Sequence, residues 1–366
     1  MTSRPMSPWG SSGEDMTSVK EIDGGSYSGS GTIVRQAVAL AALTGTDIRI
    51  TNIRCKRPNP GLRPQHTRVV DAIRGLVDGR AHGNDVGSST LIFQPGREII
   101  REAYTWDIGT AGSTVLLAQA LLPLLAFHRH QATIQLRGGI FQDFAPSFYH
   151  LEYSLLPLLR RMGLTVDARM LRPGYVPAGE GVIELDVGLL DGPLKPLMLE
   201  DRGDVERVWG VSLASHLKER HVTRRMADAA RGLLEHEGFT PDIDEIDDET
   251  AAQPGAAFAV FAEAANGVCL GADRAGAPRR MAEAVGEHAA RVLMEDLRTQ
   301  ASVDRFTADQ LVIFAALADG KSRWRIPRMT DHVEAGAWLV RELLGAEVVT
   351  SDGGFRVRGV GFSPRH

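Results

Sequence analysis

The chain has 366 residues and a formal net charge of -5, with 43% hydrophobic and 24% charged residues, which is the composition of an ordinary globular protein. It is long enough for two domains, or for one large domain with an insertion. Without a run of about 18 apolar residues the sequence predicts no membrane span. Its two cysteines, Cys55 and Cys269, lack CxxC spacing, which argues against a disulfide framework and a cysteine zinc site.

Residues 1–17 are polar and rich in Ser, Gly and Pro, without the apolar core of a signal peptide. We therefore expect a disordered extension on a cytoplasmic protein. From Ser18 a short strand leads into the glycine-rich loop DGGSYSGSG, and then into an Ala-rich helix at about 32–43 that stops at Gly45. The alternating segment DIRITNI predicts the next strand.

That strand leads to a basic stretch, residues 54–68, which reads RCKRPNPGLRPQHTR. It holds five Lys and Arg residues and no carboxylate. Its three prolines and one glycine argue against a regular helix, so we expect a stiff basic loop. Arg binds phosphate through two parallel N–H bonds, and Gln and His add directional donors. The stretch predicts a phosphate-binding loop, and the alternative is a solvated loop that happens to be basic.

The same order of strand, glycine turn and apolar helix returns further along the chain. A helix is predicted at 66–77 and a strand within 88–96, and the pattern recurs at 104–140 and at 306–345. Residues 144–163 predict a helix that begins near Pro146, and residues 164–187 predict two strands. We expect small mixed sheets with pairs of helices on one face.

Residues 188–275 differ in texture and suggest a small inserted domain. Strands are predicted at 205–215 and within 257–272, with a long amphipathic helix at 216–238. The segment PDIDEIDDETAAQPG, residues 241–255, is interpreted as a solvated acidic loop. Arg224 and Arg225 on the helix could contact nucleic acid, but a solvated helix face is the favoured interpretation.

Taken in order, these segments resemble the RNA 3′-terminal phosphate cyclase family. The motifs that carry the resemblance are DGGSYSGSGTIVR, IRCKRPNPGLRPQHTR, GTAGSTVLLAQALLPLL, GGIFQDFAP, GYVPAGEG, LEDRGDV, TADQL and DHVEAGAWLVRELLG. They cover nearly everything from residue 20 onward. The resemblance implies an α/β (α+β) fold of three repeated units, each with two helices and a four-stranded sheet, in a catalytic domain of residues 18–187 and 276–366. Residues 188–275 would form a small inserted α/β domain.

The resemblance also implies a reaction, in which ATP is consumed to convert an RNA 3′-terminal phosphate into a 2′,3′-cyclic phosphodiester. A histidine attacks the α-phosphate of ATP and becomes adenylylated, AMP passes to the RNA 3′-phosphate, and the neighbouring 2′-hydroxyl displaces AMP. His332 lies where the family keeps this nucleophile. Its imidazole is available at neutral pH because an unperturbed histidine has a pKa of about 6.5. Taken alone, His332 could equally be a surface or capping residue.

Further positions match the family's ligand-binding residues. The expected nucleotide-binding set is Gln119, Pro146, Phe306, Asp309 and Gln310. The expected RNA-phosphate-binding set is Arg35, Arg54, Arg57, Gln65 and His66. Purely structural roles stay open, because Gln119 could lie along a helix, Asp309 could cap one, and Arg35 could form a salt bridge.

Two departures from the family pattern bear on the activity. The family's metal-holding glutamate is replaced by Ser28, which removes a hard oxygen ligand from a site that must bind ATP with Mg²⁺ or Mn²⁺. The metal could still be carried by the phosphates, so no metal-binding residue is assigned. The Thr-Asn pair after the histidine is replaced by Ala335 and Gly336, whose side chains cannot orient an imidazole or bind phosphate.

Three alternatives therefore remain open. The chain could be a catalytically degenerate cyclase-like protein that binds RNA in ribosome assembly, which Ser28 favours and the retained His332 disfavours. It could be a nucleotidyltransferase that adenylylates another phosphorylated nucleic-acid end, because phosphate contacts carry no base information. The remaining enzyme alternative is an enolpyruvyl transferase, because that family has a related repeat. The likeness of fold is only an analogy, and analogy does not carry function. The expected partners are ATP and an RNA 3′-phosphate end, and the sequence leaves a homodimer open.

Overall fold

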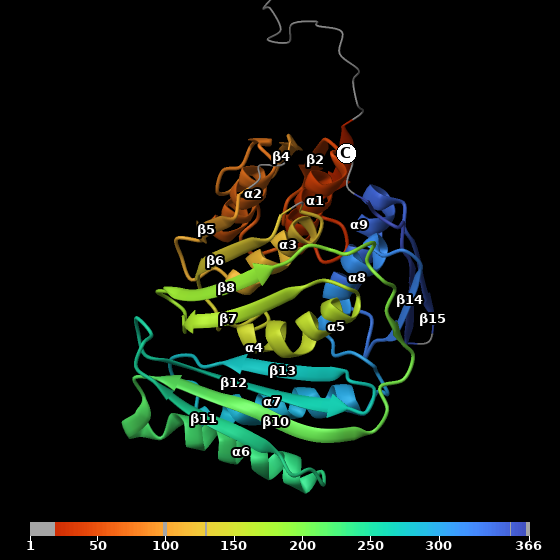
Figure 1. Cartoon of the computed structure of the whole chain (residues 1–366). Helices are drawn as coiled ribbons and strands as arrows, with labels where there is room; N and C mark the ends of the chain where they lie inside the picture. The colour runs from red at the N-terminus through yellow and green to blue at the C-terminus, as the bar shows by residue number, and fades with distance from the viewer. Residues whose placement is uncertain (1–18, 98–100, 129, 352, 364–366) are drawn as a thin grey trace, which may run out of the picture.

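The computed structural model describes residues 19–97, 101–128, 130–351 and 353–363, so the extension predicted at 1–17 lies outside the described residues. The fold contains four mixed four-stranded sheets with their helices. In Figure 1 the first, second and fourth sheets follow one another from top to bottom, and the third lies at the right. The α+β fold class predicted from the sequence is confirmed. Among the described residues, no helix is both long enough and apolar enough to cross a membrane.

The first sheet has the strand order β1-β2-β4-β3, in which β1 and β2 are parallel and the other pairs antiparallel. Its elements are β1 (Lys20–Asp23), α1 (Gly31–Thr44), β2 (Ile48–Thr51), α2 (Pro64–Leu76), β3 (Arg80–His82) and β4 (Leu91–Gln94). Helix α1 begins where Ser30 Oγ accepts a hydrogen bond from the Thr32 amide, and it ends at Gly45, which has a φ of 71°. The predicted helix at 32–43 is therefore confirmed.

One part of the basic-loop prediction was wrong. Pro64 does not exclude a helix, because it is the first residue of α2, where its missing N–H has no partner to lose. Residues 52–63 do form an irregular, turn-rich loop. The basic stretch is therefore a loop followed by one helical turn, which places Gln65 and His66 on α2.

Two more sheets repeat the strand order and pairing senses of the first sheet, as β5-β6-β8-β7 and β9-β14-β16-β15. The elements of the second sheet and its helices are β5 (Ala103–Asp107), α3 (Thr114–Ala126), β6 (Ala132–Gly138), α4 (Phe148–His150), α5 (Leu156–Arg161), β7 (Val166–Arg172) and β8 (Gly181–Val187). Those of the third are β9 (Met198–Leu199), α8 (Thr307–Leu317), β14 (Lys321–Arg325), α9 (Asp331–Leu344), β15 (Glu347–Ser351) and β16 (Gly354–Arg358). Helices α4 and α5 are joined by a π-helical turn, Leu151–Leu155.

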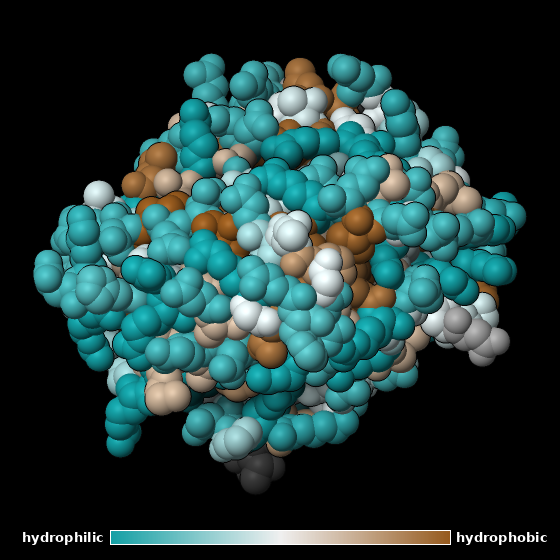
Figure 2. All heavy atoms as spheres, turned by 90° about the horizontal axis from the view of Figure 1, so that it is seen from below, coloured by the Kyte–Doolittle hydropathy of each residue, from teal (hydrophilic) through white to brown (hydrophobic). Residues whose placement is uncertain are grey.

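The fourth sheet, β11-β10-β12-β13, forms the small unit at the bottom of Figure 1. Its elements are β10 (Val205–Ser215), α6 (Val222–His236), β11 (Asp242–Asp248), β12 (Gly255–Ala264), β13 (Cys269–Ala275) and α7 (Ala282–Leu297). From below, the surface of the molecule is mostly hydrophilic, with small scattered hydrophobic patches (Figure 2). Helix α7 packs on this sheet, whereas β9 pairs with β14. The packed unit therefore runs from β10 to α7, and the predicted limits of 188–275 stay a prediction.

The acidic loop predicted at 241–255 was wrong in its first half. Residues 242–248 form β11, which pairs with β10 in parallel from Asp242 opposite Trp209 to Asp248 opposite Ser215. Ile243 is buried, and ion pairs join Asp242 to Arg207 and Glu245 to Arg231. Backbone pairing at a sheet edge outweighed the low strand propensity of Asp and Glu.

Candidate active site

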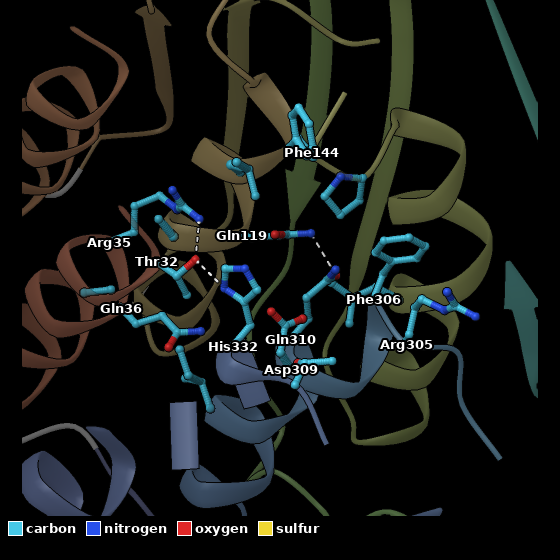
Figure 3. Close-up of a pocket in the computed structure, with 18 of the residues that line it drawn as sticks. Thr32, Arg35, Gln36, Gln119, Phe144, Arg305, Phe306, Asp309, Gln310 and His332 are labelled. Atoms are coloured by element: carbon cyan, nitrogen blue, oxygen red, sulfur yellow. Dashed lines mark hydrogen bonds between the residues drawn. The ribbon is translucent and has the colours of Figure 1, made fainter. Parts of the chain in front are cut away.

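A cavity of about 310 Å³ lies among α1, α3, α8, α9 and the segment that precedes α4. The structure brings together seven of the residues proposed from the sequence as lining residues of this one cavity (Figure 3): His332, Arg35, Gln119, Pro146, Phe306, Asp309 and Gln310. Its size is within the range of small-molecule sites. The helices that carry these residues belong to three different sheets, so the cavity exists only in the folded chain.

His332 is in the first turn of α9, whose N-cap Thr330 accepts a hydrogen bond from the Val333 amide. Its Nδ1 lies 3.2 Å from Thr32 Oγ1, and Thr32 Oγ1 also accepts a hydrogen bond of 3.1 Å from Arg35 Nη2. Burial lowers the pKa of His332, and the charges of Arg35 and Arg57 lower it further. The imidazole is therefore neutral at neutral pH, and Thr32 engages only one of its two nitrogens.

Arg35 and Asp309 are the buried charged residues of the cavity, and Arg305 and Arg328 also line it. Burial lowers the pKa of Arg35 to about 10, so the guanidinium stays protonated at neutral pH. Burial also raises the pKa of Asp309 to about 7, although Arg35 acts in the opposite direction. Asp309 therefore does not carry a full negative charge at neutral pH, and the cavity favours an anionic ligand.

The opposite wall of the cavity is held by a buried network. Asp304 Oδ1 accepts hydrogen bonds from the Phe306 and Thr307 amides and lies 3.0 Å from His150 Nε2. The rings of His150 and Phe306 pack in a T-shaped, edge-to-face arrangement, with 5.6 Å between their centroids. Gln119 Nε2 donates to Gln310 Oε1 at 2.8 Å, which joins α3 to α8. The aromatic wall is therefore fixed before a ligand binds.

Four residues proposed for phosphate binding do not line the cavity. Arg57 Nη2 donates to the Ser28 carbonyl at 3.3 Å, which joins the basic loop to the glycine-rich loop, and its charge acts on His332. Arg54 donates through Nη1 to the carbonyls of Asn59 and Gly61, so part of its guanidinium holds the loop itself. The charge of Arg57 therefore acts on His332, whereas Arg54 is engaged in holding its own loop.

His66 and Gln65 begin α2. His66 Nδ1 accepts a hydrogen bond of 3.0 Å from the Arg63 amide, and its ring lies against Gly31 at the start of α1. Burial, with Arg35, Arg54 and Arg63, lowers the pKa of His66 to about 3. His66 is thus neutral, with its remaining proton on Nε2. Gln65 packs against Gly112, just before α3.

The two departures from the family pattern have different surroundings. Ser28 is buried and its Oγ lies 2.9 Å from Ser30 Oγ. Among the described residues, no three or more His, Cys, Asp or Glu side chains are grouped as metal ligands. A Cβ on Gly336 would lie 3.5 Å from Gln36 Oε1, a buried acceptor without a hydrogen-bond partner in the described part of the chain. Gln36 therefore supplies an amide beside the position where the family has a polar side chain.

The lining residues that sequence reasoning did not select include Thr32, Gln36 and Phe144, as well as two arginines, Arg305 and Arg328. Thr32 lies three positions before Arg35 and Gln36 one position after it on α1, and that spacing could have drawn attention to them. Phe144 is fully exposed at the cavity and has a φ of 66°. The motif GGIFQDFAP included it, but only Pro146 was selected from that motif.

A neutral histidine beside a buried arginine, in a cavity with an aromatic wall, has the chemistry that suits a phosphorylated ligand. A family model described as RNA 3′-terminal phosphate cyclase matches residues 26–350. The chain belongs to the RNA 3′-terminal phosphate cyclase family. It is 39% identical to the RNA 3′-terminal phosphate cyclase of Hyperthermus butylicus, over 94% of this chain and 99% of that protein.

The similarity extends to bacterial relatives. The RNA 3′-terminal phosphate cyclase of Methylococcus capsulatus is 37% identical over 87% of this chain and 89% of its own length. Among solved structures, the enolpyruvyl transferase NikO from Streptomyces tendae matches 96% of the chain and 50% of that chain, at 13% identity and a TM-score of 0.42. A likeness this weak carries no argument about function.

Proposed function

We propose that the protein is an ATP-dependent RNA 3′-terminal phosphate cyclase that works through a histidine-AMP intermediate. The observation that carries the proposal is His332, whose lowered pKa keeps it neutral and whose Nδ1 alone is engaged, beside Arg35 in a cavity of nucleotide size. Its membership of the cyclase family supports the reaction class. The catalytic role is assigned to His332.

In the first step, Nε2 of His332 attacks the α-phosphorus of ATP. A nitrogen–phosphorus bond forms, the bond from the α-phosphorus to the bridging oxygen breaks, and pyrophosphate leaves. The attacking nitrogen must keep its lone pair, so Nδ1 carries the ring proton and donates it to Thr32 Oγ1 at 3.2 Å. Arg35, held on the same hydroxyl, offers a positive charge to the phosphates.

The remaining steps restore the histidine. An oxygen of the RNA 3′-phosphate attacks the phosphorus of the histidine-AMP, the nitrogen–phosphorus bond breaks, and AMP is transferred to the RNA end. The adjacent 2′-hydroxyl then attacks the 3′-phosphorus, loses its proton and displaces AMP. We assign Arg57, Arg54, Gln65 and the neutral Nε2–H of His66 to the RNA phosphate. Two observations support this: the charge of Arg57 acts on His332, and the His66 ring lies against Gly31 at the start of α1.

The nucleotide is assigned to the wall opposite Arg35. The Phe306 ring offers a face for the adenine base, and Pro146 lies on the same cavity. Gln119, Gln310 and Asp309 offer hydrogen bonds to the ribose or the base edge. Mg²⁺ or Mn²⁺ would be brought by the triphosphate. Ser28, which is hydrogen-bonded to Ser30, and Asp309, whose pKa is raised by burial, are poor ligands for a hard cation, so we derive no step through the metal.

The test follows the fate of the terminal phosphate. RNA carrying a labelled 3′-phosphate is incubated with the protein and ATP, and then with a phosphatase. Cyclisation makes the label resistant to the phosphatase, and resistance should require ATP and be lost in His332→Ala. A label that stays sensitive, with protein shown to be folded, would contradict the proposed function and favour a binding protein on the same fold.

A further inference from the structure

A second cavity of about 480 Å³, here called the arginine groove, lies between the fourth sheet and the connection from β7 to β8. It is formed by residues 175–177 and 276–282, by the start of β12 and by the first turn of α6. None of its lining residues is acidic, although the chain as a whole has a net charge of -5. The groove is therefore a local positive region on an acidic protein.

Four arginines line the groove, and two of them have no counter-charge. Arg225 is paired with Glu283 at 2.7 Å, and Arg280 with Asp143 at 2.7 Å. Arg220 and Arg279 are exposed, and their side chains form no hydrogen bond or ion pair with the described residues. Two guanidinium groups therefore remain available to an anionic ligand.

The backbone adds to this positive potential. Helices α6 and α7 both begin at the groove, and neither has a side-chain hydrogen bond at its N-cap, His221 or Met281. The first turn of α6 holds no acidic residue and carries the positive end of its helix dipole, whereas in the first turn of α7 Glu283 is paired with Arg225. The arginines and the start of α6 thus favour the same kind of ligand, one with repeated negative charges.

The groove is connected to the candidate active site by a single short segment. Asp143, which Arg280 and Arg274 hold from the groove side, directly precedes Phe144 at the active-site cavity. The Phe144 ring is fully exposed, and an exposed aromatic face next to a basic groove is how proteins bind single strands without reading sequence.

We propose that the arginine groove binds the phosphodiester backbone of the RNA strand that leads away from the 3′ end. Arg220 and Arg279 contact phosphates, and Phe144 stacks on a base between the groove and the cavity. This inference rests on the proposed function, because it takes the 3′-terminal phosphate to lie near His332. It assigns RNA binding to the small unit from β10 to α7 in addition to the basic loop.

The test compares two 3′-phosphorylated probes, a dinucleotide and an oligonucleotide of about 12 nucleotides. Binding is measured by fluorescence anisotropy at several salt concentrations, with the intact protein and without ATP. The variant is Arg220→Gln/Arg279→Gln. The matched control is Arg80→Gln/Arg356→Gln, which removes the same charge from exposed positions outside both cavities.

We expect the groove variant to bind the longer probe about five- to tenfold more weakly than the unchanged protein does. Its affinity for the dinucleotide should not change. The slope of log Kd against log salt for the longer probe should fall by about 1.4, because each single-strand phosphate contact contributes about 0.7. Phe144→Ala should weaken the longer probe further, since stacking on one base contributes a factor of about five or more. The control variant should keep the affinity of the unchanged protein for the longer probe and the slope of log Kd against log salt.

Equal losses in the groove variant and the control would overturn the inference, as would equal losses for both probes. Binding without ATP does not depend on adenylylation, so this result is separate from the test of the proposed function. If the protein forms no histidine-AMP but the groove variant still shows the length-dependent loss, the proposed cyclase function is refuted and RNA binding in the arginine groove is supported.

Discussion

Thr32 is the residue whose replacement tests the arrangement around His332 most sharply. Its hydroxyl accepts from Arg35 Nη2 at 3.1 Å and lies 3.2 Å from His332 Nδ1. Thr32→Val keeps the branched shape and removes the hydroxyl. His332 then loses the acceptor that keeps its proton on Nδ1, and Nε2 is no longer held as the free nucleophile.

The size of the effect can be estimated from these two contacts. One neutral hydrogen bond contributes about 1 kcal/mol, and a bond to a charged group about 1.5–3 kcal/mol. Losing the groups that orient a functional histidine commonly costs about 10- to 100-fold, or about 1.4–2.7 kcal/mol in the activation free energy. We expect this loss in the rate of adenylylation, with a smaller change in KM for ATP.

The assay is single-turnover labelling with ATP carrying a labelled α-phosphate. Thr32→Ser retains the hydroxyl and should stay within a few fold of the unchanged protein. Thr44→Val removes a hydroxyl from the last turn of the same helix, where it bonds the Leu40 carbonyl, and controls for helix stability. If Thr32→Val labels at the unchanged rate, Thr32 does not orient His332 and the tautomer argument is refuted.

Three further predictions concern pH, phosphate binding and packing. Two groups should shape the pH profile of adenylylation, with an inflection near pH 7 from Asp309 that is absent in Asp309→Asn. Because the pKa of His332 is lowered, its neutral form persists as the pH falls, so in Asp309→Asn adenylylation should decline only below about pH 6.5. Arg57→Ala should weaken binding of 3′-phosphorylated RNA about tenfold more than binding of 3′-hydroxyl RNA, measured by anisotropy. Gly31→Ala should destabilise the protein by about 1–3 kcal/mol in urea unfolding, because its Cβ would collide with the His66 ring.

Each of these predictions has an opposing outcome. An acid limb above pH 6.5 in Asp309→Asn would mean that burial and the charge of Arg35 do not lower the pKa of His332. Equal losses for both RNA ends in Arg57→Ala would make the basic loop a general polyanion surface. Gly75→Ala, in α2 with open space around it, is the matched control and should be neutral or slightly stabilising. Equal effects at both glycines would remove the packing argument.

The elements that the sequence predicted correctly have local signals. Helix α1 has a serine N-cap, an apolar face and Gly45 at its end, and all three are visible in the sequence. Strand β11 lacks such a signal, because its acidic residues are held by pairing with β10. Helix α7 was not predicted, and β9 is two residues long and exists only through its pairing with β14.

The candidate site divides along the same line. The resemblance to a family located His332 and the residues that share its cavity, although their roles stay proposals. The contact between Thr32 and His332 could not be predicted from the sequence, because the two residues are 300 positions apart and meet only through packing of α1 against α9. The sequence also could not show that Arg54 donates to the carbonyls of its own loop, since that depends on the loop conformation.

The central claim is that His332 forms a covalent bond to AMP. The protein is incubated with ATP labelled on the α-phosphate and a divalent cation, and then separated by denaturing electrophoresis. The account predicts a labelled, acid-labile band, as expected for a phosphoramidate, that is absent in a folded His332→Ala variant. No label with either Mg²⁺ or Mn²⁺, from protein shown to be folded, would contradict the claim, and so would equal labelling of His332→Ala.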